Sequence, residues 1–168
     1  MGAVTVSVDL GCGGGPRNDF GADEVYGVDL VAQPGNPAVR VADLCVDPIP
    51  FETSSVDYVL AYDFVEHVPR LLYVDGVRRN PFIELMNEVW RVLKPGGTFL
   101  ACTPALPHPE SFVDPTHVNY VTEGTLAYFT DHAAGLTRSY GFRGQFTGGQ
   151  AWHPQVPYWL VWQLQAVK

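Results

Sequence analysis

The sequence has 168 residues, of which 46% are hydrophobic and 17% are charged. This length and apolar content suffice for one domain with its own core, and they argue against a coiled coil, a helical bundle or a disordered chain. The formal net charge of -8 disfavours sequence-independent binding to nucleic-acid backbones or to anionic membranes.

Four short apolar runs in the N-terminal part of the chain each end at or beside an aspartate. They are residues 4–10 (VTVSVDL), 24–30 (EVYGVDL), 39–44 (VRVADL) and 56–63 (VDYVLAYD). Nearly continuous apolar runs are typical of parallel strands that are covered on both faces. The carboxyl ends of such strands meet at one edge of the sheet, so the aspartates indicate a polar site there.

The remainder of the chain alternates between predicted helices, strands and long loops. Spacings of three and four predict a helix over 81–93, residues 98–102 predict a fifth strand, and residues 122–135 predict a shorter helix with Leu126, Phe129 and Ala133 on one face. A closing pair of strands is expected at 143–146 and 158–167, and loops at 69–80, 103–121 and 148–157.

This order of elements predicts an α/β fold, namely a Rossmann-like, doubly wound, mostly parallel sheet with an antiparallel C-terminal edge strand. We expect one minimal domain over residues 1–168. Residues 1–104 would form its cofactor-binding half, and residues 105–168 would supply the substrate side and the closing strands.

The first strand runs into a glycine-rich turn, Asp9-Leu-Gly11-Cys-Gly13-Gly-Gly15. Such a loop can be a plain turn, or it can let backbone approach a ligand, and Asp29 lies where an acid could bind ribose hydroxyls. A dinucleotide would need a full helix after the turn, and Asp9 would repel its phosphates. S-adenosylmethionine carries net positive charge, so it suits Asp9, Asp29 and Asp43 better.

These segments resemble the class I S-adenosylmethionine-dependent methyltransferases. The glycine turn is similar to the first motif of that family, Gly-Val-Asp29-Leu to its ribose-binding acid, and Ala-Asp43-Leu to the acid near adenine. Residues 49–68 and 88–100 (EVWRVLKPGGTFL) are similar to the family's fourth-strand segment and to its next helix, turn and strand. The short turn and the Asp114-Pro-Thr-His117 segment look most like a small bacterial and phage methyltransferase type 11-like subgroup.

The resemblance, together with the predicted edge of the sheet, implies a set of cofactor-binding residues. They are Asp9, Gly11, Cys12 (through its backbone), Gly13, Gly15, Asp29, Leu30, Asp43, Leu44, Tyr62 and Asp63. The cofactor would be S-adenosyl-L-methionine, and the product S-adenosyl-L-homocysteine.

Methyl transfer needs an aligned acceptor and a base if the acceptor holds its proton tightly. His67 or Glu66, just past the fourth strand, could be that base, and His117 is expected at the same edge. Alternatively, Asp63, Glu66, His67 and His117 could form a divalent metal site, which would resemble the arrangement in small-RNA 2′-O-methyltransferases. We predict no metal, because Glu and His in such segments also cap helices or bond to backbone.

The predicted function is methyl transfer to a small molecule or sugar, at oxygen, because the Asn-Pro-Pro-Tyr type segment used for amino groups is missing after the fourth strand. The alternative is a non-catalytic module that binds the cofactor or its product and acts through protein contacts. The missing helix after the glycine turn motivates it.

Expected partners are a small-molecule acceptor and, because no N-terminal cover for the site is evident, a second copy of the chain. Long nucleic acids and membranes are not expected as partners.

The sequence has no signal peptide, no 18-residue apolar span and no paired cysteines, so we expect a cytoplasmic protein. The aromatics Trp152, Tyr158, Trp159 and Trp162 could wall an acceptor pocket or belong to the core, while His108, His132 and His153 are expected to be ordinary loop or surface residues.

Overall fold

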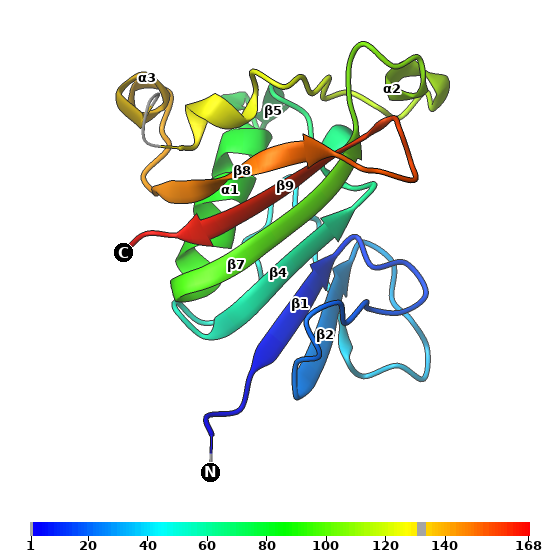
Figure 1. The fold of residues 1–168 in the computed structure, drawn as a ribbon, viewed down its shortest axis with the longest axis vertical. Coiled ribbons are helices and arrows are strands. Elements are labelled where there is room, and N and C mark those ends of the chain that lie inside the picture. The colour runs from blue at the N-terminus through cyan, green and yellow to red at the C-terminus, as the bar shows by residue number, and fades with distance from the viewer. Residues whose placement is uncertain (1, 131–133) are drawn as a thin grey trace.

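The computed structural model describes residues 2–130 and 134–168, and it is built around a seven-stranded sheet (Figure 1). The strand order is β3-β2-β1-β4-β7-β9-β8. The strands are β1 (Val6–Leu10), β2 (Glu24–Asp29), β3 (Val39–Val41), β4 (Val56–Tyr62), β7 (Leu93–Pro104), β8 (Phe146–Trp152) and β9 (Trp159–Ala166). The strands from β3 to β7 are parallel, and β9 and β8 are antiparallel to their neighbours. The predicted fold class is confirmed.

The sheet changes its direction of winding at β1. After β1 the chain builds outward through β2 and β3, and it then returns to place β4 on the other side of β1. The loops that follow β1 and β4 therefore leave the sheet in opposite directions, and ligands of doubly wound sheets bind in the crevice between such loops. This topology places the predicted site at the carboxyl ends of β1, β2 and β4.

One face of the sheet is covered by α1 (Pro81–Val92), whose bounds match the periodicity of the sequence. Pro81 occupies the first turn, where no intrahelical N–H bond is lost. The apolar stripe of α1 is buried against the sheet and against Phe129, and it shares one core with these strand and helix residues: Val8, Leu10, Val59, Phe82, Leu85, Met86, Val89, Phe99, Trp162 and Leu164.

The other face of the sheet has a loop where doubly wound folds place a helix. Residues 12–23 contain no helix, as the sequence predicts. Phe20 of this segment stacks on Tyr58 of β4 at 4.4 Å between ring centroids. Farther along this face, Thr147, Gln163 and Gln165 are exposed on β8 and β9. The uncovered part of the sheet is therefore polar and does not require a covering helix.

The predicted helix over 122–135 is wrong. Leu126 and Phe129 are buried as expected, but they belong to a single 3₁₀ turn, η2 (Leu126–Tyr128), and to the residue after it. Thr130 then forms a bridge with Phe146, so the chain leaves the helical conformation to pair with β8. Ala133 lies outside the described residues, and a separate helix, α3, spans Ala134–Ser139.

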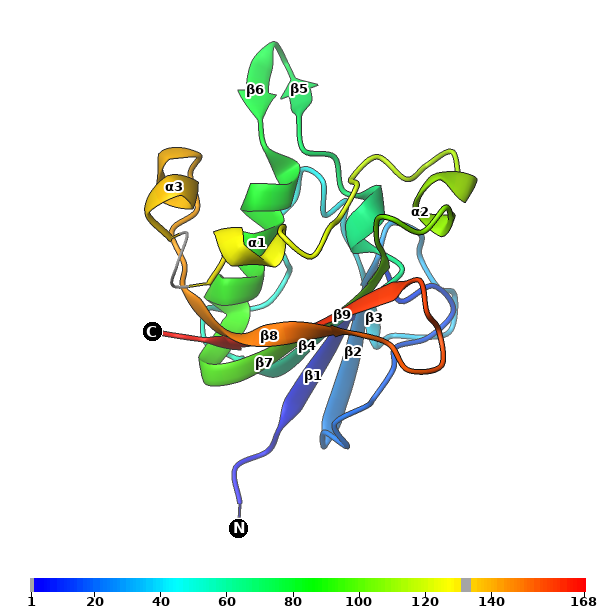
Figure 2. The same cartoon turned by 45° about the horizontal axis from the view of Figure 1, so that its top comes forward.

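Two predicted loops contain regular structure. Residues 69–80 form a hairpin, β5 (Leu72–Val74) and β6 (Val77–Arg79), which projects beyond the rest of the molecule (Figure 2). Its turn is Asp75-Gly76, with both φ angles positive, a hairpin signal that the sequence prediction missed. Residues 103–121 hold a short helix, α2 (Glu110–Val113), and the 3₁₀ turn η1 (Val65–His67) follows β4.

The closing strands are found, but with different bounds. Strand β8 begins where the predicted strand over 143–146 ends, and it takes up the first part of the loop predicted over 148–157. Gly148 allows this, because its φ is +130° and a Cβ there would lie 2.2 Å from the Gln163 carbonyl. Strand β9 is inserted between β7 and β8, so β8 forms the edge. No helix in the described parts of the chain is long and apolar enough to span a membrane.

Candidate active site at the carboxyl edge of the sheet

The glycine turn after β1 is held against the loop that follows β4. Gly11 has a φ of +68°, and its N–H donates to the carbonyl of Val28 on β2 at 2.8 Å. A Cβ at Gly11 would lie 2.6 Å from the ring of Phe64, so glycine is required for both conformation and space. Sequence analysis missed Phe64; an aromatic residue two positions past the end of β4 was the available signal.

Asp29 and the glycine turn form one unit. The carboxylate of Asp29 accepts hydrogen bonds from the N–H of Gly13 at 2.8 Å and from that of Val31 at 2.9 Å. It is therefore fixed beside the glycine turn at the end of β2. Leu30, 65% exposed, forms the outer rim of this region.

Asp43 is also held by backbone, but its neighbour Leu44 faces inward. Asp43 accepts a hydrogen bond from the N–H of Cys45 at 3.0 Å and stays half-buried. Leu44 is buried in the hydrophobic core, so its side chain supports the position of Asp43.

The segment after the glycine turn folds back over the ends of β1 and β4. Asp9 is buried and accepts a hydrogen bond from the N–H of Arg17 at 2.9 Å, while burial raises the pKa of this carboxyl. The Arg17 guanidinium lies over the ring of Tyr62, 4.1 Å from its centroid, and the Tyr62 hydroxyl donates to Asp19. A short loop thereby takes the place that a helix usually fills.

The side chain of Cys12 points away from the open edge of the glycine turn. A Cβ at Gly27 on β2 would lie 2.3 Å from the Cys12 sulfur, so the thiol fits where β2 has no side chain. Burial raises its pKa to about 11, which keeps it in the thiol form. The side chain of Cys12 is therefore engaged with β2, and a contact between its backbone and a cofactor stays a prediction.

A second group of polar side chains lies where β4 and β7 end. Glu66 in η1 is 1% exposed, and its Oε2 accepts a hydrogen bond from the hydroxyl of Thr103 at 2.8 Å. Removal from water raises the pKa of Glu66 to about 7. The Glu66 Oε1 atom lies 4.0 Å from His117 Nε2, and the rings of His67 and His117 stand edge to face at 4.9 Å.

The loop that carries His117 is fastened to η1 by Asn119. The backbone N–H groups of Val118 and Asn119 both donate to the Glu66 carbonyl at 2.9 Å. The buried Asn119 amide donates to the Val65 carbonyl at 3.0 Å, and its oxygen accepts from Arg70 Nε at 2.7 Å. The structure therefore brings together all three residues that the sequence proposed as catalytic: Glu66, His67 and His117.

Asp63 does not join this cluster. Among the described residues, the metal-ligating types that come together are Glu66, His67 and His117. Asp63, in a left-handed conformation with a φ of +46°, instead accepts a hydrogen bond from Trp159 Nε1 at 2.7 Å. The four-residue metal cluster considered from the sequence is thus wrong in one member, because the chain turns sharply between β4 and η1.

The C-terminal aromatics divide between the core and the site. Trp162 is fully buried beneath α1, whereas Trp159 lies edge-on to Tyr62 and reaches the end of β4. Antiparallel insertion of β9 places its first residues at the carboxyl edge of the parallel strands, which explains this difference.

The remaining histidines lie outside the cluster of Glu66, His67 and His117. His108 lies against Trp152, and His153 accepts backbone N–H bonds from residues 155 and 156. His132 lies outside the described residues.

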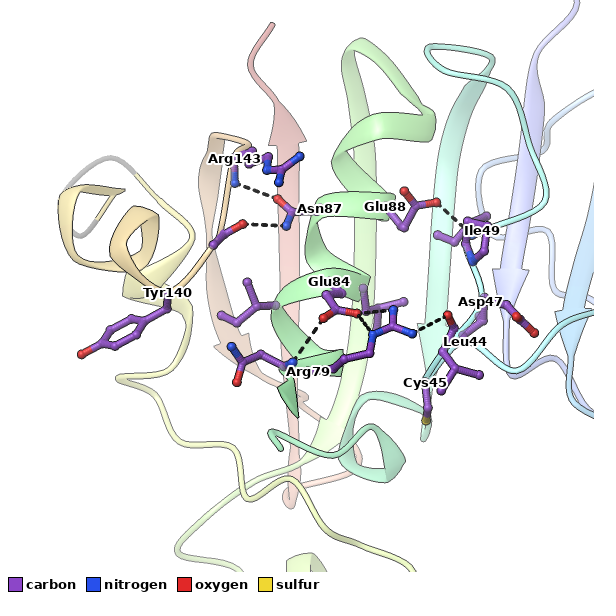
Figure 3. Close-up of a pocket in the computed structure, with 16 residues that line it drawn as sticks. Leu44, Cys45, Asp47, Ile49, Arg79, Glu84, Asn87, Glu88, Tyr140 and Arg143 are labelled. Carbon is purple, nitrogen blue, oxygen red and sulfur yellow. Dashed lines mark hydrogen bonds and ion pairs between the residues drawn. The ribbon is translucent and has the colours of Figure 1, made fainter. Parts of the chain in front are cut away.

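A groove of about 460 Å³ runs along α1 on the helix side of the sheet (Figure 3). Three of its polar side chains are bonded to groups within the groove: Arg79 to Glu84, Glu88 to the N–H of Ile49, and Asn87 to the N–H of Arg143. Its lining residues include Leu44 and Cys45, which follow Asp43, but neither the glycine turn nor Tyr62 or Asp63. The groove therefore lies apart from the glycine turn and adjoins the predicted site at residues 44 and 45.

The sequence profile of the methyltransferase domain family matches residues 8–101, which is more than half of the chain. The chain belongs to this family. The match begins in β1, ends in β7 and contains the glycine turn, Asp29, Asp43 and Glu66 of this methyltransferase domain. No curated protein matches the sequence.

Solved structures share the fold of this methyltransferase domain at low sequence identity. A chain of the Haloferax volcanii complex between the Trm112 methyltransferase activator and a methyltransferase is 17% identical, with a TM-score of 0.65 over 98% of this chain and 83% of that chain. An S-adenosylmethionine-dependent methyltransferase from Archaeoglobus fulgidus is also 17% identical, with a TM-score of 0.60 over 96% and 86%.

A third similar structure contains two bound small molecules. It is the 1,6-didemethyltoxoflavin-N1-methyltransferase from Burkholderia thailandensis, with bound 1,6-didemethyltoxoflavin and S-adenosylhomocysteine. It is 17% identical, with a TM-score of 0.57 over 98% of this chain and 72% of that chain.

Proposed function

We propose that this protein binds S-adenosyl-L-methionine at the glycine turn and transfers its methyl group to an oxygen of a small molecule or sugar. The observation that carries the proposal is the unit formed by Asp29 and the glycine turn at the switch point of a methyltransferase fold. Asp29 would bind the ribose hydroxyls, Asp43 would lie toward adenine, and backbone of residues 11–15 would meet the methionine part.

The charge of this edge supports a cationic ligand. Asp9 lies one residue before the end of β1, Asp29 ends β2 and Asp63 follows β4. The Arg17 guanidinium near them is engaged with Tyr62. S-adenosylmethionine has a sulfonium and an ammonium against one carboxylate, so these acids would attract it. Departure of neutral sulfur after transfer removes one positive charge, which would favour release of the product.

Glu66, His67 and His117 are suited to the acceptor side of the reaction. As the acceptor oxygen attacks the methyl carbon, the bond from carbon to sulfur breaks and the acceptor proton must leave. Two imidazoles and a buried carboxylate lie close enough to one another to receive that proton. A base of this kind favours a hydroxyl acceptor, whose proton is held tightly until the transition state.

A second candidate function rests on the missing helix after the glycine turn. A non-catalytic module could keep the cofactor site and act through protein contacts. The two functions differ in the outcome of replacing Glu66, His67 and His117. In an enzyme each replacement lowers methyl transfer, whereas in a binding module no acceptor is methylated and cofactor binding is unchanged.

Calorimetric titration with S-adenosylmethionine and S-adenosylhomocysteine tests the cofactor site. We expect saturable binding that Asp29→Asn weakens by about 10-fold or more, because a hydrogen bond to a charged group is lost. Glu52→Gln is the matched control, since it removes one exposed negative charge away from the turn. Failure of the folded wild-type protein to bind either ligand would overturn the proposal.

An acceptor screen with radiolabelled methyl groups tests the chemistry. We expect label in hydroxylated small molecules or sugars, and loss of the label with His67→Ala or His117→Ala while cofactor binding persists. Label that appears only on nitrogen acceptors would contradict the preference for oxygen.

A location in the cytoplasm and assembly as a homodimer remain predictions. Cell fractionation would check the location, and light scattering would check the oligomeric state.

A further inference from the structure

The cluster of Glu66, His67 and His117 has a geometry that a base alone does not explain. Its members come from two separate segments, and one ligand atom from each lies within 4.8 Å of the others. Glu66 Oε1 is buried and has no hydrogen-bond partner among the residues that the structure describes. A buried oxygen without a partner is destabilising unless something else occupies that position.

The hydrogen bonds around His117 determine which of its nitrogens is free. His117 Nδ1 lies 3.2 Å from the carbonyl oxygen of Ser111, which can only accept, so Nδ1 carries the proton. The lone pair of the neutral ring is then on Nε2, the atom that faces Glu66 Oε1 at 4.0 Å. Two acceptors face each other at a distance too long for a hydrogen bond and suitable for a shared cation.

The same reasoning applies to His67. The Thr116 hydroxyl has one hydrogen and donates it to Asp114 at 2.6 Å, so the His67 Nδ1 atom, 3.0 Å from that hydroxyl, must be the donor. Its Nε2 then carries the lone pair. Each of the two imidazoles is therefore oriented by a hydrogen bond at Nδ1, and Glu66 is oriented by its bond from Thr103. Metal-ligating side chains are commonly held by such a second hydrogen-bond partner.

We propose that Glu66, His67 and His117 bind one divalent transition-metal ion, with Zn²⁺ as the representative species. Two imidazole nitrogens and one carboxylate oxygen form a typical three-ligand set that leaves a position open. Bonds of about 2.0–2.2 Å would bring the ligand atoms to roughly 3–4 Å from one another, which is a small contraction of the present spacing. Asp63 is bonded to Trp159 and is not a ligand.

The effect of this ion on catalysis rests on the proposed methyl transfer, whereas the binding of the ion does not depend on it. At the open position an ion would hold the acceptor hydroxyl and lower its pKa, so that its proton passes to solvent water and not to the coordinated imidazoles. The oxygen would then attack the methyl carbon as the bond from carbon to sulfur breaks and neutral S-adenosylhomocysteine leaves. Where the ion expands from four ligands to five, a hydroxyl neighboured by a second oxygen, as in a sugar diol or a catechol, would suit the site because both oxygens can coordinate.

Titration of the chelator-treated protein with Co²⁺ tests the site directly, because a bound ion with few ligands gives intense visible bands. We expect one ion per chain, displaced by Zn²⁺. His67→Ala and His117→Ala should abolish the bands, and Glu66→Gln should weaken binding. Thr116→Val should lower affinity by about 10-fold or more, because the outer partner of His67 is lost.

Two matched variants control for other sites. His108→Ala removes an imidazole outside the cluster, and Cys45→Ser removes a half-buried thiol; both should keep the bands. The inference is overturned if the wild-type protein binds no Co²⁺, or if the bands persist in folded His67→Ala protein. His67 and His117 lie in separate segments, so His67→Ala keeps the test decisive if His117→Ala fails to fold.

Calorimetry with S-adenosylmethionine on the same samples separates the two proposals. Cofactor binding without Co²⁺ binding would overturn the metal site and leave the proposed function intact. Co²⁺ binding without cofactor binding would support the metal site and overturn the proposed function.

Discussion

Glu66 and His117 face each other across 4.0 Å at the carboxyl edge of the sheet, although they follow different strands. Glu66 belongs to the 3₁₀ turn after β4, and His117 to the long loop after β7. Backbone bonds from residues 118 and 119 to the Glu66 carbonyl hold the two segments together. The acceptor side of the proposed site therefore depends on how one loop is fastened to a turn.

Asn119→Ala should loosen this attachment. The change removes the amide bond to the Val65 carbonyl and the bond from Arg70, so we expect a loss of about 1–3 kcal/mol in the free energy of unfolding. Methyl transfer should fall while the Kd for S-adenosylmethionine is unchanged, because His117 shifts and the glycine turn does not. Denaturant unfolding and calorimetry measure the two effects. Val118→Ala, at a half-exposed side chain, should leave both unchanged.

Gly11→Ala should destabilise the glycine turn and weaken cofactor binding. A left-handed φ costs alanine about 1–2 kcal/mol, and the clash with Phe64 adds to it, so the free energy of unfolding should fall by about 2–4 kcal/mol. Gly14→Ala is the control, since a Cβ there meets nothing within 4 Å. Equal thermal stability of the two variants would contradict the structural role assigned to Gly11.

Asp9→Asn should stabilise the protein at neutral pH while weakening cofactor binding. Burial raises the pKa of Asp9, so the free energy of unfolding falls as pH rises from the ordinary value of 3.8 toward the raised one, and stays lower above it. Asparagine avoids this penalty and can still accept the Arg17 N–H bond. The melting temperature of the variant should exceed that of the wild type at pH 7 and approach it in acid.

The cofactor affinity of Asp9→Asn should fall by about 10-fold, equivalent to about 1.4 kcal/mol, because a negative charge beside the cationic methionine group is lost. Calorimetry at pH 7 measures this change. A variant that is less stable than the wild type at pH 7 would contradict the desolvation argument.

Trp159→Phe should lower methyl transfer with little effect on stability. Phenylalanine keeps an aromatic ring near Tyr62 but cannot donate to Asp63, so the sharp turn after β4 loses one hydrogen bond. We expect a loss of about 1 kcal/mol, or roughly 5-fold in kcat/KM. Trp152→Phe is the matched control, because it also removes a hydrogen bond from an indole N–H to a carboxylate, that of Glu123. This control should retain more activity than Trp159→Phe.

The sequence by itself determined the fold class and the proximity of Asp29 to the glycine turn. Apolar runs that end at acids specify parallel strands whose carboxyl ends share one edge, and the three- and four-residue spacing of residues 81–93 specifies α1. Asp29 and the glycine turn are local to two adjacent strands, so their proximity follows from the strand order. Glu66, His67 and His117 could be proposed because each follows a strand that ends at this edge.

Only the tertiary structure decided which of these side chains meet. Asp63 immediately follows β4, yet a left-handed turn directs it to Trp159 and away from Glu66. Phe64 against Gly11 and Trp159 at the site depend on contacts between segments far apart in sequence. The failed helix over 122–135 has the same cause, because pairing of Thr130 with Phe146 outweighs a local preference. Periodicity reports local conformation and burial, whereas loop paths are set by long-range packing.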